Sequence, residues 1–196
     1  MDKSMPPGAG KSSFDLVDAE KVLGELRLKG GITFLDMACG KGEYALAASE
    51  IIGSNGLIHA IDLWEEGIAE LRQKTSVRSI HNIRAEVADL RGPIPIGDNS
   101  VDVCLMATVL HDLVETGVAN QALKEAARVL KEDGLLAVVE FKKIDGPPGP
   151  PIQIRLTPEE VEHLAAPYGF VKKQVIDVGP YNYMVTFVIK KMRKPE

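Results

Sequence analysis

Apolar runs and helically spaced apolar residues alternate through most of the chain. Near-continuous apolar runs cover residues 32–37, 57–61, 101–107 and 135–141, and a more polar run covers 81–87. Such runs are typical of strands that are covered on both faces, and the segments between them carry apolar residues at helical spacing. This alternation predicts an α/β domain in which helices cover a parallel sheet.

The two ends of the chain depart from this alternation. Helical spacing over 16–26 predicts an additional helix before the first strand, and a later amphipathic helix is expected to stop at Asp133. Thr157 occupies the N-cap position of a last helix, inside a capping box. The β-rich runs 170–178 and 181–191 are joined by a Gly-Pro turn, which predicts an antiparallel hairpin.

The first strand leads into a glycine turn and then a helix. Gly40 and Gly42 follow the run at 32–37, and Tyr44 opens a segment with apolar residues at helical spacing. Glycines here remove the side chains that would keep a ligand away from the backbone, and the amides of a helix N-terminus attract polar ligand groups. We expect a nucleotide-like ligand at this turn.

The second strand ends in a carboxylate. Asp62 lies 22 residues beyond Gly40. In a right-handed strand-helix-strand unit the two strands are neighbours, so Asp62 can accept hydrogen bonds from both ribose hydroxyls. A nicotinamide or flavin dinucleotide matches residues 40–45 loosely, but the carboxylate of Asp36 would repel a pyrophosphate. A cofactor with an ammonium group suits Asp36 better.

The stretch 35–42, Leu-Asp-Met-Ala-Cys-Gly-Lys-Gly, resembles the first motif of the class I S-adenosylmethionine-dependent methyltransferases. Ala38 stands where the motif usually has its first glycine, a departure shared by some ubiquinone and menaquinone biosynthesis methyltransferases. The resemblance extends over roughly residues 12 to 190. It implies a three-layer, Rossmann-like α/β fold with seven strands in the order 3-2-1-4-5-7-6, the last strand antiparallel. It also implies S-adenosyl-L-methionine as the cofactor.

The same resemblance implies roles for single residues. The backbone at Gly40 and Gly42 would approach the cofactor, Asp36 would meet its ammonium group and Asp62 its ribose. Asp89, at the end of the third strand, would accept a hydrogen bond from the adenine amino group, with a leucine on each face of the ring. The cofactor-binding residues expected in this way are Asp36, Ala38, Gly40, Gly42, Asp62, Leu63, Asp89, Leu90 and Ala107.

His111 follows the fourth strand, at the edge where open α/β sheets bind their ligands. The segment 108–113 is therefore expected to border the transferred methyl group. With an ordinary pKa of about 6.5 an imidazole is mostly neutral near pH 7, so His111 is the candidate general base for an oxygen or nitrogen acceptor. Asp112 is less suited, because a solvated carboxylate with a pKa of about 3.9 is a weak base. The alternative is that His111 only packs or caps a helix.

The acceptor is not identified by any motif. Candidates for contact with it are Tyr44, Trp64, Arg155, Tyr181 and Tyr183, although aromatic and arginine side chains also serve packing. No large inserted cap domain is visible. This favours either a small-molecule acceptor held by short loops or a larger one covered by a partner.

Composition and charge exclude several classes of function. With 23 basic and 28 acidic residues the net charge is −5, which gives no electrostatic footprint for nucleic acid. Cys39 and Cys104 lack the spacing of a metal site and are expected to be buried free thiols. Residues 8–13 end like a phosphate-binding loop, but Met5 stands where that loop needs its first glycine.

The expected organisation is a single domain. It comprises a flexible N-terminal arm at 1–14, a methyltransferase domain at 15–191 and a C-terminal tail at 192–196. No apolar run approaches ~18 residues and the start does not match a signal peptide, so we expect a soluble, cytoplasmic protein. The oligomeric state is not determined by the sequence. Two alternatives to a methyltransferase are a non-catalytic S-adenosylmethionine-binding protein or partner subunit, and an NAD(P)-dependent oxidoreductase.

Overall fold

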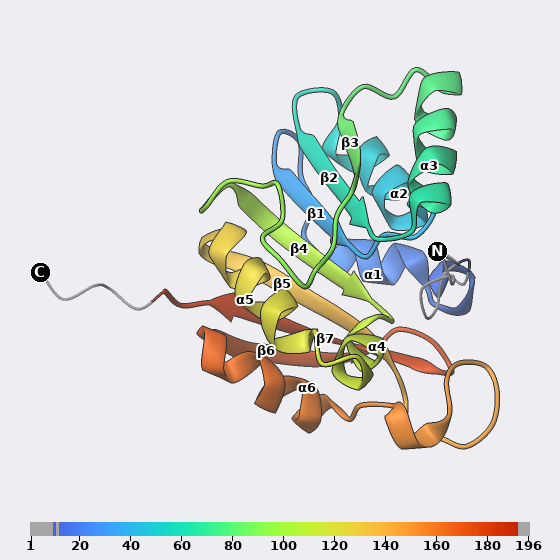
Figure 1. Ribbon diagram of the computed structural model, residues 1–196, viewed down its shortest axis with the longest axis vertical. Helices are drawn as coiled ribbons and strands as arrows, with labels where there is room; N and C mark the ends of the chain where they lie inside the picture. Colours follow the sequence, from blue (N-terminus) through green and yellow to red (C-terminus); the bar gives the residue numbers. More distant parts are fainter. Residues whose placement is uncertain (1–9, 11, 192–196) are drawn as a thin grey trace, which may run out of the picture.

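A seven-stranded sheet forms the centre of the computed structural model, which describes Gly10 and residues 12–191 (Figure 1). The strands are β1 (Thr33–Met37), β2 (Leu57–Asp62), β3 (Ile83–Val87), β4 (Val101–Ala107), β5 (Leu130–Phe141), β6 (Phe170–Asp177) and β7 (Asn182–Ile189). Their order is β3-β2-β1-β4-β5-β7-β6. The pairs among β1 to β5 are parallel, whereas β7 is antiparallel to both its neighbours. The expected strand order and antiparallel last strand are confirmed.

Helices on both faces of the sheet produce three layers. They are α1 (Ala19–Glu25), α2 (Glu43–Ile52), α3 (Glu65–Val77), α4 (Leu110–Glu115), α5 (Ala119–Val129) and α6 (Pro158–Ala165), with 3-10 turns η1 (Phe14–Leu16), η2 (Ile152–Ile154) and η3 (Ala166–Tyr168). The helices α1, α2 and α3 pack on one face through a cluster that includes Leu23, Ala48 and Leu71. On the other face, α4, α5 and α6 pack through a second cluster that includes Leu123 and Val161.

The central strands are buried on both faces. In β1, Phe34 belongs to one hydrophobic cluster, whereas Leu35 and Met37 belong to the other. In β4, Leu105 and Met106 divide between the clusters in the same way. Because few positions of such strands face water, the sequence is apolar at nearly every position, and this is why the pattern located them.

Several boundaries differ from the sequence prediction. β5 begins at Leu130, five residues early, because Leu130 already pairs with Val101 of β4. The helix α5, which was expected to stop at Asp133, ends at Val129, and Asp133 lies inside β5, where it has a φ of 60° and the register with β4 shifts, as at a bulge. β3 begins at Ile83 rather than at 81. The N-terminal helix begins at Ala19, because Asp18 caps it, rather than at 16.

The last helix begins as predicted. The side chain of Thr157 accepts a hydrogen bond from the backbone N–H of Glu160 at 3.2 Å. The Glu160 carboxylate accepts one from the N–H of Thr157 at 2.7 Å, which completes the capping box.

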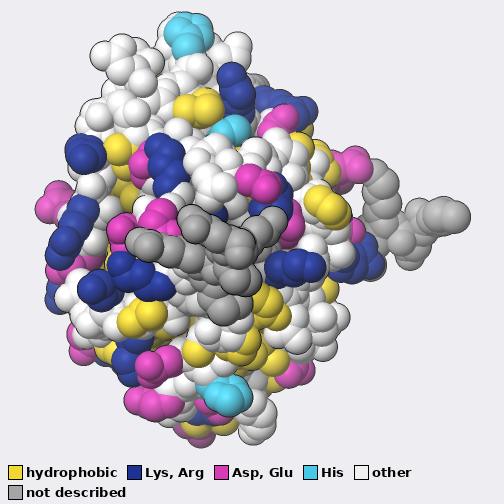
Figure 2. All heavy atoms as spheres, turned by 90° about the vertical axis from the view of Figure 1, so that its left-hand side faces the viewer, with side chains coloured by type: hydrophobic (Ala, Val, Ile, Leu, Met, Phe, Trp, Pro, Cys, Tyr) yellow, Lys and Arg dark blue, Asp and Glu magenta, His cyan; other side chains and the backbone are white. Residues whose placement is uncertain are grey.

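The carboxyl ends of the parallel strands meet at the right-hand edge in Figure 1, where α4 and the start of α1 also lie. The opposite surface, which is on the left-hand side in Figure 1, carries interspersed acidic and basic side chains (Figure 2). In the described part of the chain, no helix has both the length and the apolar character needed to cross a bilayer.

Candidate functional site

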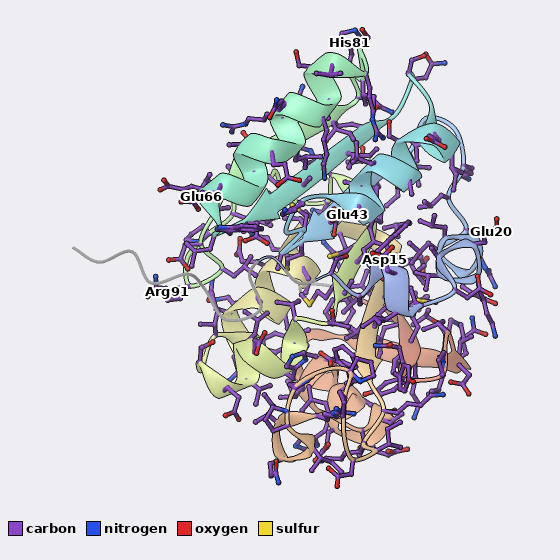
Figure 3. All side chains as sticks on the ribbon, turned by 90° about the vertical axis from the view of Figure 1, so that its right-hand side faces the viewer. Asp15, Glu20, Glu43, Glu66, His81 and Arg91 are labelled. Atoms are coloured by element: carbon purple, nitrogen blue, oxygen red, sulfur yellow. The ribbon has the colours of Figure 1, made fainter. Side chains whose placement is uncertain are left out.

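A cavity of about 680 Å³ opens at the carboxyl ends of the strands. This is within the usual size range of small-molecule sites and lies where open α/β sheets bind ligands. Of the expected cofactor residues, its wall contains Asp36, Ala38, Gly40, Asp62, Leu63, Asp89, Leu90 and Ala107. Gly42 and His111 are not on this wall. In Figure 3, Asp15, Glu43 and Arg91, which also line the cavity, surround this region.

The glycine turn has a left-handed backbone. The φ angles are 62° at Ala38, 56° at Gly40 and 77° at Gly42. A Cβ atom on Gly40 would have nothing within 4 Å, whereas one on Gly42 would lie 2.5 Å from the side chain of Leu71. Gly42 therefore permits the turn to pack against α3, which is a structural reason for this glycine that the sequence motif does not reveal.

Asp62 fixes the glycine turn. Its Oδ2 accepts a 2.7 Å hydrogen bond from the backbone N–H of Gly40, and its Oδ1 accepts one of the same length from the N–H of Trp64. A carboxylate has about four acceptor positions, so positions remain for ribose hydroxyls. The same residue can thus hold the loop and a ligand.

Asp36 is a buried carboxyl group in the cavity wall. It is 1% exposed and accepts a hydrogen bond of 3.1 Å from the N–H of Ala45 in α2. Burial raises the pKa of Asp36 to about 7; the Ala45 amide opposes this rise, and the charges of Asp62 and Glu43 add to it. A cationic ligand group beside Asp36 would favour the ionised form of this carboxyl group. The site therefore suits a ligand with an ammonium group.

The expected adenine end contains an arginine that sequence reasoning missed. Arg91 donates from its Nε and Nη2 atoms to the carboxylate of Asp89, at 2.7 to 3.0 Å. These hydrogen bonds lower the pKa of Asp89. Leu90 is buried and Leu63 is 46% exposed, so Leu63 offers an open apolar surface at the cavity. The only signal in the sequence was an arginine two residues after the strand-end aspartate.

Lys41, between the two glycines, is turned toward α3. Its Nζ lies 2.8 Å from the carboxylate of Glu70 and 5.8 Å from the ring centre of Trp64. Glu70 therefore neutralises the cation in the turn.

The other end of the cavity is built from the segment after β4 and from the N-terminal segment. Thr108, Val109, Asp112 and Leu113 contribute to the wall here, and so does Val118 before α5. Apolar and polar groups alternate along this wall. Such a surface can take a ligand with an apolar body and a polar group.

The N-terminal segment closes one side of the cavity. Ser12, Ser13 and Asp15 line it, and the buried Ser13 hydroxyl lies 3.1 Å from the hydroxyl of Tyr44 in α2. Phe14 also packs against the edge of the Tyr44 ring. Most of the arm expected at 1–14 lies outside the described residues.

His111 lies behind the cavity wall and not on it. It is 4% exposed, and its Nδ1 lies 2.8 Å from the carboxylate of Glu140 at the end of β5. The backbone N–H of His111 donates to the same carboxylate at 3.1 Å. On the other side of the ring, Nε2 lies 3.6 Å from the carboxylate of Asp112, which does line the cavity.

The ordinary pKa expected for His111 is wrong. Burial acts to lower the pKa of the imidazole, but the hydrogen bond and charge of Glu140, with the charge of Asp112, outweigh it and raise the pKa. Arg155 opposes this rise. Near pH 7 the imidazole of His111 is therefore protonated in a larger fraction of molecules than its ordinary pKa would give. The side chain of Asp112 is 21% exposed, so this carboxylate is less solvated than the sequence prediction assumed.

Arg155 is a structural residue, although it was a candidate for acceptor contact. It is 2% exposed, and its guanidinium donates to the carbonyls of alternate residues in the proline-rich loop: Lys142, Ile144, Gly146, Pro148 and Pro150. The Tyr183 hydroxyl donates to the carbonyl of Leu156, also away from the cavity. Tyr181 is exposed outside the wall, whereas Tyr44 and Trp64 do line it.

Among the described residues no group of three or more His, Cys, Asp or Glu side chains is arranged to hold a metal ion. Both cysteines are free, and burial raises the pKa of each thiol. Cys104 is buried in β4, whereas Cys39 is partly exposed at the cavity.

Comparison with known proteins agrees with the fold and the motif. The family described as "Methyltransferase domain" matches residues 34–134. A demethylmenaquinone methyltransferase of Staphylococcus aureus (strain MRSA252) is 31% identical over 121 residues, which is 62% of this chain and 48% of that protein. The chain thus spans about half the length of the curated relatives it matches.

Solved structures extend the similarity over nearly the whole chain. A SAM-dependent methyltransferase from Aquifex aeolicus is 33% identical with a TM-score of 0.83, covering 92% of this chain and 94% of that one. The [4+2]-cyclase SpnF shares the fold at 20% identity with a TM-score of 0.72, covering 86% and 78% of the two chains. The chain belongs to the methyltransferase domain family, in the class of S-adenosylmethionine-dependent enzymes with the class I fold, whose cofactor is S-adenosyl-L-methionine.

Proposed function

We propose that this protein transfers a methyl group from S-adenosyl-L-methionine to a small-molecule acceptor. The observation that carries this proposal is the buried Asp36 carboxyl beside the glycine turn, in a cavity that continues past the expected cofactor residues to the segment after β4. Asp36 would meet the ammonium group, Asp62 the ribose, and Asp89 with Leu63 and Leu90 the adenine. Ala38, Gly40 and Ala107 would contact the cofactor through the turn and the end of β4.

The acceptor we propose has an apolar body and a protic group, as a quinol or phenol has. Val109, Leu113 and Val118 supply apolar wall, while Thr108 and Asp112 supply polar atoms. The six carboxylates on the wall (Asp15, Asp36, Glu43, Asp62, Asp89, Asp112) disfavour an anionic acceptor. The name of the Staphylococcus relative, a demethylmenaquinone methyltransferase, also points to a quinone-type acceptor.

The chemistry requires alignment more than covalent catalysis. The bound cofactor supplies a methyl group already activated on a sulfonium. The chain's own residues hold donor and acceptor in line and exclude water, which lowers the entropic part of the barrier. Asp112 is placed to accept a hydrogen bond from the acceptor's protic group. His111 lies behind Asp112 and can take up the acceptor's proton when its imidazole is in the neutral form.

One experiment tests this proposal. The protein is incubated with radiolabelled S-adenosylmethionine and a reduced demethylmenaquinone analogue or a metabolite extract, and labelled product is measured. Transfer supports an enzyme. Binding without transfer supports the non-catalytic alternative, because a shared fold does not by itself determine the activity.

A second arm separates the cofactor classes. At a hundredfold excess over its dissociation constant, S-adenosylhomocysteine should stabilise the protein by about 2.7 kcal/mol, and NADH should not. A thermal shift with NADH alone would favour an oxidoreductase. The domain limits at 14 and 191 and the cytoplasmic location stay predictions.

A further inference from the structure

Thr108 has a strained backbone at the edge of the cavity. It follows the last residue of β4 and has a φ of 53°, in the left-handed region. A β-branched residue rarely adopts this conformation, because its branched side chain crowds the backbone. Glycine or asparagine would meet the same backbone requirement at lower cost.

The neighbouring strand turns in the same way. Met37 of β1 pairs with Met106 of β4, so the carboxyl ends of the two strands lie side by side. Ala38 has a φ of 62°, and both Ala38 and Thr108 line the cavity. The two turns lie where the expected cofactor and acceptor regions meet.

The backbone of Thr108 is anchored, but its hydroxyl is not. The N–H of Thr108 donates to the carbonyl of Val139 in β5 at 2.7 Å, so the chain is still held to the sheet at this residue. Within the described part of the chain, no residue hydrogen-bonds the Thr108 hydroxyl. A strained residue without a side-chain hydrogen bond to the protein is explained best by a contact with a ligand.

Thr108 also lies between the apolar part and the polar part of the cavity wall. Val109 and Leu113 follow it along the chain, and the Asp112 carboxylate lies on the same wall. A hydroxyl can both donate and accept, so it suits an acceptor's O–H or N–H group beside a carboxylate.

We propose that the Thr108 hydroxyl is the specificity-determining contact of the acceptor site, where it hydrogen-bonds the protic group that receives the methyl. This inference rests on the proposed methyl transfer. It predicts discrimination between acceptors that carry this protic group and analogues that lack it, because a polar group of the site would lose its partner with the analogue.

The test uses protein loaded with S-adenosylhomocysteine and two probes, 1-naphthol and naphthalene, with affinities measured by calorimetry. Wild type should prefer 1-naphthol by about tenfold or more. Thr108→Val, which is isosteric, should reduce this preference to within about threefold, and Thr108→Ser should retain it. Thr75→Val is the matched control, because the Thr75 hydroxyl donates to the Arg72 carbonyl on α3, outside the cavity wall.

A stability measurement separates ligand contact from a structural role. Thr108→Asn relieves the left-handed strain and should raise the Tm by about 2–4 °C while weakening 1-naphthol binding. A lower Tm with an unchanged probe preference would overturn the inference, and so would wild type that binds neither probe or prefers neither. Failure of the proposed function is distinct, since it would appear as absent S-adenosylhomocysteine binding or absent methyl transfer by wild type.

Discussion

The carboxylate of Asp62 accepts a 2.7 Å hydrogen bond from the backbone N–H of Gly40, which joins the end of β2 to the glycine turn after β1. The two residues are 22 positions apart, and the parallel pairing of β1 with β2 brings them together. One side chain therefore shapes the turn and faces the cavity.

Asp62→Ala should weaken binding of S-adenosylhomocysteine by about 1.5–3 kcal/mol, the range for hydrogen bonds to a charged group. The expected loss combines the proposed ribose contact with a looser glycine turn. Titration calorimetry measures it. Asp145→Ala serves as the control, because Asp145 is exposed and, among the described residues, its carboxylate accepts a hydrogen bond only from the N–H of Gly146. Unchanged affinity in Asp62→Ala would remove Asp62 from the site.

The affinity for S-adenosylhomocysteine should rise with pH. Since the pKa of Asp36 in the unliganded protein is about 7, binding of an ammonium group below this pH must expel a proton. The dissociation constant should fall by about tenfold per pH unit well below the pKa and level off above pH 7.5. Asp36→Asn should bind weakly at every pH. A wild-type affinity that is constant between pH 5.5 and 7.5 would contradict this role.

The same carboxyl group sets a stability trend in the unliganded protein. The folded state holds a proton that the unfolded chain, with a pKa of 3.8, releases. The contribution of Asp36 is therefore fully present below about pH 3.8 and is lost as the pH rises toward 7. Asp36→Asn should show a smaller loss of unfolding free energy over this interval, as measured by urea denaturation at fixed pH values.

The sequence predicted correctly that several of the expected cofactor residues lie at one edge of the sheet, on the wall of one cavity, because the signals that mark these residues are local. Asp36, Gly40 and Asp62 each lie at the end or turn of an apolar run, and the right-handed strand-helix-strand unit has essentially one geometry. Strand number and order then followed from the resemblance. A sequence pattern is enough to predict a structural feature when residues close together in the sequence form that feature.

The sequence did not reveal contacts made between distant segments. Glu140 lies near the end of an apolar run, and no feature of the neighbouring sequence indicates that it pairs with His111, which lies 29 residues earlier. Arg155 was a candidate for acceptor contact because its type suggested it, yet it binds the carbonyls of a loop that precedes it. Such pairings depend on how β5 and α4 meet in space, which no periodicity encodes.

Arg155→Lys should destabilise the protein without abolishing S-adenosylhomocysteine binding. A lysine cannot reproduce the planar fork that holds five carbonyls, and buried carbonyls without partners are costly. We expect a loss of about 3 kcal/mol or more in unfolding free energy by urea titration. The exposed Arg78→Lys is the control. A loss of acceptor binding at full stability would return Arg155 to the site.

The Glu140–His111 pair should govern how activity depends on pH. Because Glu140 raises the pKa of His111, the imidazole must lose a proton before it can take one from the acceptor, so turnover should rise with pH through a value above 6.5. Glu140→Gln removes the charge and should move this limb to lower pH, while S-adenosylhomocysteine affinity stays unchanged. The exposed Glu132→Gln should leave the limb in place.

His111→Ala should then lower the turnover number by about 10²-fold with little change in cofactor affinity. The contribution of His111 to stability has the same direction as that of Asp36: because its pKa is raised in the folded state, the contribution is fully present below the unfolded value of 6.5 and is lost as the pH rises through the folded value. Turnover and urea denaturation are both measured from pH 6 to 9. If the mutant's turnover stays within a few-fold of wild type over this range, His111 and Glu140 serve packing at the end of β5, and methyl transfer proceeds by alignment alone.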